Sequence, residues 1–185
     1  LALWGEKGPP PVAPVEPVAV KRLSPATDGE PGRGVPVVPL MPGFCPNKWL
    51  MTTPLDFAVQ GDPLTEIGSM AAAKVEAGKK FSIAGKPVSF EPVPPDFLLL
   101  VGRGGVTLSR LMQNRSALTI CLHTVYEVKQ RQLVKVNLPF GRAGKPVMTL
   151  AGQQVTHGQL LQLDKGRYPA TVAISLASKW ESYAP

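Results

Sequence analysis

The chain has 185 residues, 44% of them hydrophobic, which is enough for the core of one ordinary domain, and 20 Lys and Arg against 13 Asp and Glu give it a net charge of +7. Its 21 prolines and 18 glycines interrupt continuous helices, so the composition favours short extended segments joined by turns. No apolar run reaches the roughly 18 residues of a membrane span and no signal peptide is visible, so we expect no membrane span here.

Residues 1–46 hold eleven of the prolines and are predicted to form an extended arm or linker. The segment also carries many valines and leucines, which makes it more apolar than a solvated linker should be. We therefore expect the arm to lie against a protein surface. Residues 47–178 are predicted to form the folded domain, and residues 179–185 a C-terminal tail. Because the chain begins at Leu1, we expect it to be a piece of a longer polypeptide.

The segment after the arm starts with a predicted strand from Trp49 that ends at Pro54. The one helical signal follows in GDPLTEIGSMAAAKVEAG, where Asp62 is a natural N-cap, Pro63 occupies the first helical position, and Gly78 ends the pattern. KKFSIAGKPVSFEPVP then alternates apolar residues on both sides of an AGK turn, which predicts a β-hairpin. The apolar run at 97–101 is predicted to be a buried strand.

Residues 118–177 alternate apolar and polar residues over several short segments, which places one face of each segment in a core. The turns are predicted at KQRQ, at AGQQ and at Asp164 to Gly166. Short strands at this spacing are typical of an antiparallel sandwich or barrel. We predict a mainly β fold, an antiparallel β-sandwich of the jelly-roll type with one short helix and a proline-rich extended N-terminal arm.

A resemblance to a known family rests on the order of WLMTTPLDF, AGKKFSIAGKPVSFEPVP, TVYEVKQRQLVKVNL and VMTLAGQQVTHGQLLQLDKGRYPATVAISL. This order resembles the jelly-roll accessory domains of large bacterial polysaccharide-active enzymes, which are similar to galactose-binding-like β-sandwich modules. The resemblance covers residues 49–176. Where the family pattern carries Asn before the turn glycine, this chain has Ala151. The resemblance implies a non-catalytic module of a larger carbohydrate-active protein, extracellular or periplasmic, that braces or docks other domains.

The sequence shows no arrangement of residues that indicates an active site, a cofactor or a metal site, and we predict that this chain is not an enzyme. His123 alternates with apolar neighbours, which is more typical of a buried sheet histidine than of a general base. The glycine-rich VGRGGV lacks both the GxGxxG and the GK[ST] patterns of phosphate-binding loops. Cys45 and Cys121 form either one disulfide, if the protein is exported, or two buried free thiols.

Positive charge is concentrated between Val101 and Ala170, where ten basic residues stand against two acidic ones. One interpretation is a solubilising outer face, and the other is a surface that attracts acidic polysaccharide. Two aromatic residues near the C-terminus could stack on sugar rings or could dock the tail on a domain. The candidate ligand-binding residues are therefore Arg131, Lys135, Arg142, Lys145, Trp180 and Tyr183.

Two other functions remain open at this point. The chain could be a structural subunit of a multi-chain assembly with no ligand of its own, in which case partners would bury the apolar residues of the arm. It could also be a basic nucleic-acid-binding module that contacts phosphates. We rank nucleic acid third, because single-strand binders stack bases on sheet aromatics and only 6% of this chain is aromatic.

Overall fold

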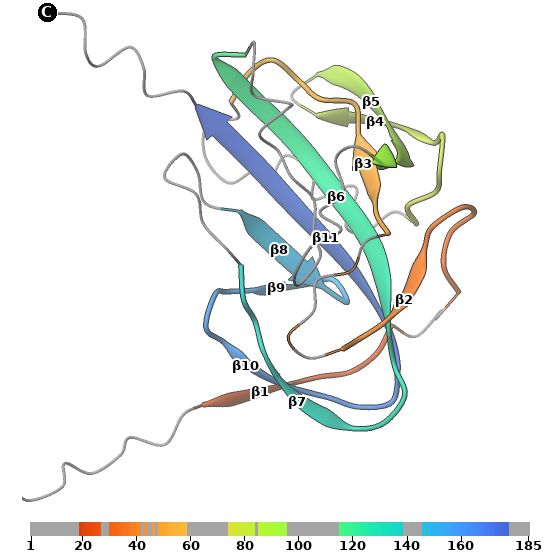
Figure 1. Cartoon of the computed structure of the whole chain (residues 1–185), viewed down its shortest axis with the longest axis vertical. Coiled ribbons are helices and arrows are strands. Elements are labelled where there is room, and N and C mark those ends of the chain that lie inside the picture. Colours follow the sequence, from red (N-terminus) through yellow and green to blue (C-terminus); the bar gives the residue numbers. More distant parts are fainter. Residues whose placement is uncertain are drawn as a thin grey trace, which may run out of the picture.

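The computed structural model describes residues 19–26, 30–41, 43, 46, 48–58, 74–83, 85–95, 115–138 and 146–177. These residues are mainly β, in curled and largely antiparallel sheets, which confirms the predicted fold class at this level (Figure 1). No helix in this part of the chain is long and apolar enough to cross a membrane. The strands are β1 (Val20–Leu23), β2 (Val37–Pro39), β3 (Leu50–Thr52), β4 (Lys80–Ile83), β5 (Lys86–Pro92), β6 (Ala117–Val128), β7 (Gln132–Lys135), β8 (Val147–Leu150), β9 (Gln153–Val155), β10 (Leu160–Leu163) and β11 (Gly166–Ala177).

Two long antiparallel strands, β6 and β11, form the centre of the molecule (Figure 1). They pair over twelve residues each, from Gly166 opposite Val128 to Ala177 opposite Ala117. β6 is rich in β-branched and other apolar residues and is buried on both faces over most of its length, as expected for a central strand. The larger sheet has the order β4-β5-β3-β6-β11-β8-β9, and β2 also pairs with β6.

The smaller sheet has the order β1-β10-β7 and lies at one end of the central pair. β6 continues into β7, and β10 continues into β11, through two short turns. β1 lies parallel to β10, with Arg22 opposite Gln162, whereas β7 lies antiparallel to β10. Figure 1 shows this sheet at the bottom, with the chain curling out of the long pair into it.

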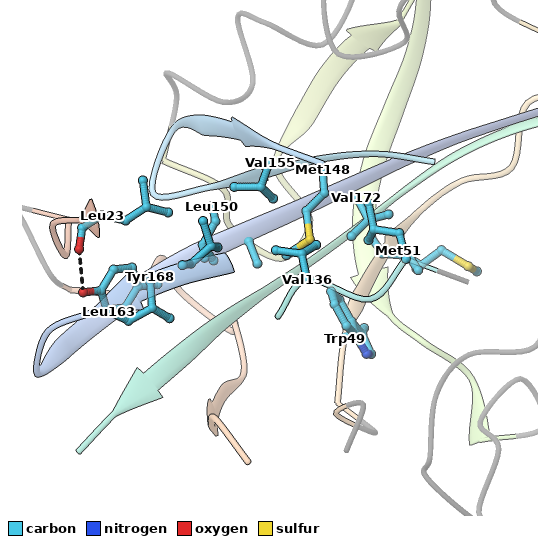
Figure 2. Packing of buried hydrophobic residues seen from close by; sticks show 14 of the residues in the cluster. Leu23, Trp49, Met51, Val136, Met148, Leu150, Val155, Leu163, Tyr168 and Val172 are labelled. Carbon is cyan, nitrogen blue, oxygen red and sulfur yellow. Dashed lines mark hydrogen bonds between the residues drawn. The ribbon is translucent and has the colours of Figure 1, made fainter. Parts of the chain in front are cut away.

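Alternate residues of the central pair contribute to two hydrophobic clusters, because successive side chains of a strand point to opposite faces. One cluster joins β6 residues such as Leu118 and Ile120 to Leu161 and Leu163 of the smaller sheet. Figure 2 shows part of this cluster, including Leu163 and Val172. The other cluster joins β6 to the β4–β5 hairpin, and its members are Val35, Leu50, Val75, Ile83, Val88, Phe90, Cys121, Val125 and Ala173. The central pair is therefore covered by apolar side chains on both faces.

Two local predictions are confirmed by the larger sheet. The predicted strand after Trp49 is β3, and the predicted hairpin is β4 paired with β5, with Gly85 at a positive φ of 75° in the turn. The apolar residues of that hairpin alternate as expected, since Val88 and Phe90 are both buried. Most of the predicted helix and the whole predicted strand at 97–101 lie outside the described residues.

Part of the range assigned to the proline-rich arm belongs to the sheets. Residues 19–26 and 30–41 are described, and they contain β1 and β2. Leu23 is completely buried, and Val35 and Val38 are nearly so. These apolar residues pack against the chain's own strands. The first 18 residues lie outside the described part of the chain.

The turn between β8 and β9 contains a strained residue. Leu150 pairs with Gln153, so Ala151 and Gly152 form a two-residue hairpin turn, and their φ angles are 48° and 76°. Turns of this kind need positive φ at both positions, which is why Asn-Gly is their preferred sequence. Ala151 is the non-glycine residue with a positive φ among the described residues. Its Cβ costs roughly 1–2 kcal/mol in this conformation.

Replacing Ala151 with Asn should therefore stabilise the protein. Asn tolerates the left-handed conformation, and we expect the free energy of unfolding to rise by about 0.5–1 kcal/mol, which corresponds to a few degrees in Tm. Chemical denaturation of the two proteins measures the difference. Gln153→Asn, two residues further on in β9, is the matched control and should bring no gain. Equal stability of Ala151→Asn and the parent would contradict the turn strain.

Candidate functional site: a basic end of the central pair

Two turns and one edge strand bring five basic side chains to one end of the central pair. Gly166 lies opposite Val128, so the β6–β7 turn and the β10–β11 turn are neighbours. β1 lies beside β10 and adds a residue from far away in the sequence. We call this set the basic end; it consists of Arg22, Lys129, Arg131, Lys165 and Arg167.

Asp164 holds two of these side chains in place. Nε and Nη2 of Arg22 donate to Oδ2 of Asp164 at 3.0 and 2.8 Å, and Nε of Arg131 donates to Oδ1 at 2.6 Å. These hydrogen bonds, first from Arg22 and then from Arg131, lower the pKa of the Asp164 carboxyl below its ordinary value of 3.8. The Arg22 and Arg131 side chains are about 60% exposed, so the ion pairs contribute little to stability. Their main effect is to fix two cations side by side.

Close packing sets the position of the second turn. A Cβ on Gly166 would lie 2.4 Å from Cβ of Pro25, so only glycine allows the β10–β11 turn to approach the segment after β1. The backbone N–H of Ala26 donates to the carbonyl of Arg167 at 3.0 Å in the same place. The Arg167 side chain, in turn, forms an ion pair with Glu30 at 3.3 Å. The backbone of Gly166 and Arg167 is thus held against the segment that follows β1.

The two lysines of the basic end are available to a ligand. Lys129 and Lys165 are exposed, and neither has a hydrogen bond or an ion pair among the described residues. Both line an open depression of about 480 Å³, together with Glu127, Val128, Gly166 and Arg167. An anionic group that entered this depression would meet two exposed ammonium groups and, as far as the described residues go, would displace no partner of either.

Only part of the predicted ligand-binding set can be placed. Arg131 lies in the basic end, and Lys135 lies four residues away at the far end of β7, where it is exposed. Arg142, Lys145, Trp180 and Tyr183 lie outside the described residues. Lys129 and Lys165 were not among the predicted ligand-binding residues, although both stand in predicted turns. Arg22 was not predicted either, because nothing local indicates a residue that pairs 142 positions away.

His123 lies inside the larger sheet, away from the basic end. Its side chain is 6% exposed, its Nδ1 shares a hydrogen bond of 2.8 Å with Oγ1 of Thr171, and the ring of Phe90 packs edge-on against it. Burial lowers the pKa of His123 from 6.5 to about 4, so the ring is neutral at neutral pH. The exposed His157 accepts a hydrogen bond from the backbone N–H of Leu138.

Cys121 is a buried free thiol in the same sheet. Burial raises the pKa of Cys121 to about 12, so the thiolate needed for nucleophilic or redox chemistry does not form at neutral pH. Cys45, the other cysteine considered for a disulfide, lies outside the described residues. Within the described ranges, no three His, Cys, Asp or Glu side chains come close enough together to hold a metal ion.

Comparisons of the chain with protein-family models, with curated proteins and with solved structures found no match.

Proposed function

We propose that this chain is a non-catalytic β-sandwich accessory module of a larger, extracellular or periplasmic carbohydrate-active protein, and that its basic end binds acidic polysaccharide. The carbohydrate context comes from the resemblance of residues 49–176 to jelly-roll accessory domains. A sandwich architecture agrees with the two apolar clusters, one on each face of the central pair.

The observation that carries the binding proposal is the gathering of five cations, of which Lys129 and Lys165 have no partner among the described residues. Sulfate and carboxylate groups of a polysaccharide repeat along the chain, so they could contact the two lysines and the Arg22–Arg131 pair at the same time. None of the five residues is aromatic, so attraction between charges, and not ring stacking, would dominate. Binding should therefore weaken steeply with salt.

The proposal predicts that Lys129→Glu/Lys165→Glu lowers the affinity for heparin, a sulfated polymer, or for polygalacturonate, a carboxylated polymer, by about tenfold at low salt. Isothermal titration at two salt concentrations measures the effect. Lys80→Glu/Lys86→Glu is the matched control, because it changes the net charge equally on the exposed β4–β5 hairpin. The control should lose much less affinity.

Other outcomes of this experiment would exclude the proposal. Equal losses in both double variants would indicate attraction by net charge alone, without a site. No binding of either polymer at low salt would remove the glycan function. Stronger, lysine-dependent binding of a single-stranded DNA oligonucleotide than of both polysaccharides would instead favour the nucleic-acid alternative.

A further inference from the structure

The register of β1, β10 and β7 determines which residues form the outer face of the smaller sheet. Leu23, Leu161 and Leu163 point inward and are completely or almost completely buried. The residues between them in sequence must point outward. In rows across the three strands, the outer face consists of Val20, Leu160 and Lys135, followed by Arg22, Gln162 and Leu133.

Apolar side chains are unusually exposed on this face. Leu133 is 58% and Val20 is 47% exposed, and they are two of the four large hydrophobic residues in the exposed class among the described residues. Leu160 of β10 is half-buried. It lies opposite Val20 of β1 and diagonally across from Leu133 of β7. Single exposed hydrophobic residues are common on protein surfaces, but adjoining ones on one face are typical of an interaction site.

The charges around these residues indicate what kind of partner fits. Arg22 and Lys135 stand on the face, and Arg131 stands at its edge. The carboxylate beside them is that of Asp164, and both of its oxygens already accept hydrogen bonds from the two arginines. Among the described residues, this face and its edge therefore carry three positive charges (Arg22, Arg131 and Lys135) against the one negative charge of Asp164. A second copy of the chain would bring like charges together, whereas an acidic partner would neutralise them.

We infer that the outer face of the smaller sheet docks an acidic protein segment that also carries aliphatic side chains. The aliphatic side chains of the segment would cover Val20, Leu160 and Leu133, and its carboxylates would lie near Arg22 and Lys135. This inference goes beyond glycan binding, because its ligand is a protein and its central residues are not Lys129 and Lys165. The two proposals can therefore fail separately.

The test is an NMR titration of the whole 185-residue chain with a decapeptide of alternating glutamate and valine. Peptides of alternating lysine and valine, and of alternating glutamate and serine, serve as controls. We expect the first peptide alone to shift backbone amide signals of β1, β7 and β10. Leu133→Ser should weaken its binding about tenfold, and Lys135→Glu should shift the preference towards the lysine peptide.

Met41→Ser is the matched control, because Met41 is 49% exposed but follows β2 and is not a residue of the three strands of the smaller sheet. It should leave peptide binding unchanged. Leu133→Ser should also leave heparin affinity unchanged, which separates this proposal from the polysaccharide site. Lys135→Glu provides a second change, at an exposed residue, in case Leu133→Ser impairs folding. The inference is overturned by no amide shifts in the three strands, by equal binding of the glutamate–serine peptide, or by self-association through this face.

Discussion

Replacing Tyr168 with alanine should lower the free energy of unfolding by about 3–5 kcal/mol, the largest change that we expect from one substitution in this protein. Tyr168 is completely buried between β11 and the smaller sheet, where its ring belongs to the same cluster as Leu23 and Leu163 (Figure 2). Its removal would leave a cavity at the junction of the two sheets. Urea denaturation, followed by circular dichroism, measures the loss.

Tyr168→Phe separates packing from hydrogen bonding. The Tyr168 hydroxyl lies 3.2 Å from the carbonyl of Leu23 and 3.0 Å from that of Asp164, so it links β1 to the β10–β11 turn. Phenylalanine keeps the ring and loses this link, and we expect a cost of about 1 kcal/mol. If the alanine variant lost no more stability than the phenylalanine variant, the burial of the ring would not be what holds the two sheets together.

Lowering the pH from 7 to 4 should remove about 3 kcal/mol of stability through His123 alone. In the folded protein its pKa is about 4, whereas its ordinary value, which applies to the unfolded chain, is 6.5. The unfolded chain therefore binds a proton below pH 6.5 that the folded protein does not bind until about pH 4. The contribution of His123 to the free energy of unfolding is therefore fully present above about pH 6.5. It is lost as the pH falls from 6.5 to about 4, by at most 1.36 kcal/mol per pH unit.

His123→Gln should remove this part of the pH dependence, because glutamine does not titrate and can still bond to Thr171. The measurement is the difference in unfolding free energy between pH 7 and pH 4 for the two proteins. The effect of Asp164 falls in a separate range, below its ordinary pKa of 3.8. An unchanged slope in His123→Gln would show that the buried ring is not responsible.

Hydrophobic alternation predicted the strands well because it is a local property. Val88 and Phe90 are buried on the same face of β5, and Leu161 and Leu163 are buried on the same face of β10, as their spacing indicates. Alternation does not determine which strands become neighbours. The parallel pairing of β1 with β10 could not be read from the sequence, because the β1 segment lies among prolines that indicate an extended arm.

The candidate site depended on neighbours in space, and the sequence predicted it only in part. Arg131 was identified from a run of basic residues, but its structural partner is Asp164, and that carboxylate also holds Arg22. Lys129 and Lys165 became candidates only when the register placed their two turns together. Residues such as Arg142, which were chosen from the same basic run, lie outside the described part of the chain.

The parallel pairing of β1 with β10 also affects how the chain assembles during translation. Arg22 and Asp164 are 142 positions apart, and at roughly 5–20 residues per second the ribosome takes about 7–28 s to make the segment between them. β1 therefore emerges long before its neighbour exists. Contacts across such a distance also form slowly, since a large loop must close first. The smaller sheet, and with it the basic end, is expected to form late, and Leu23 has no strand of its own sheet to pack against until then.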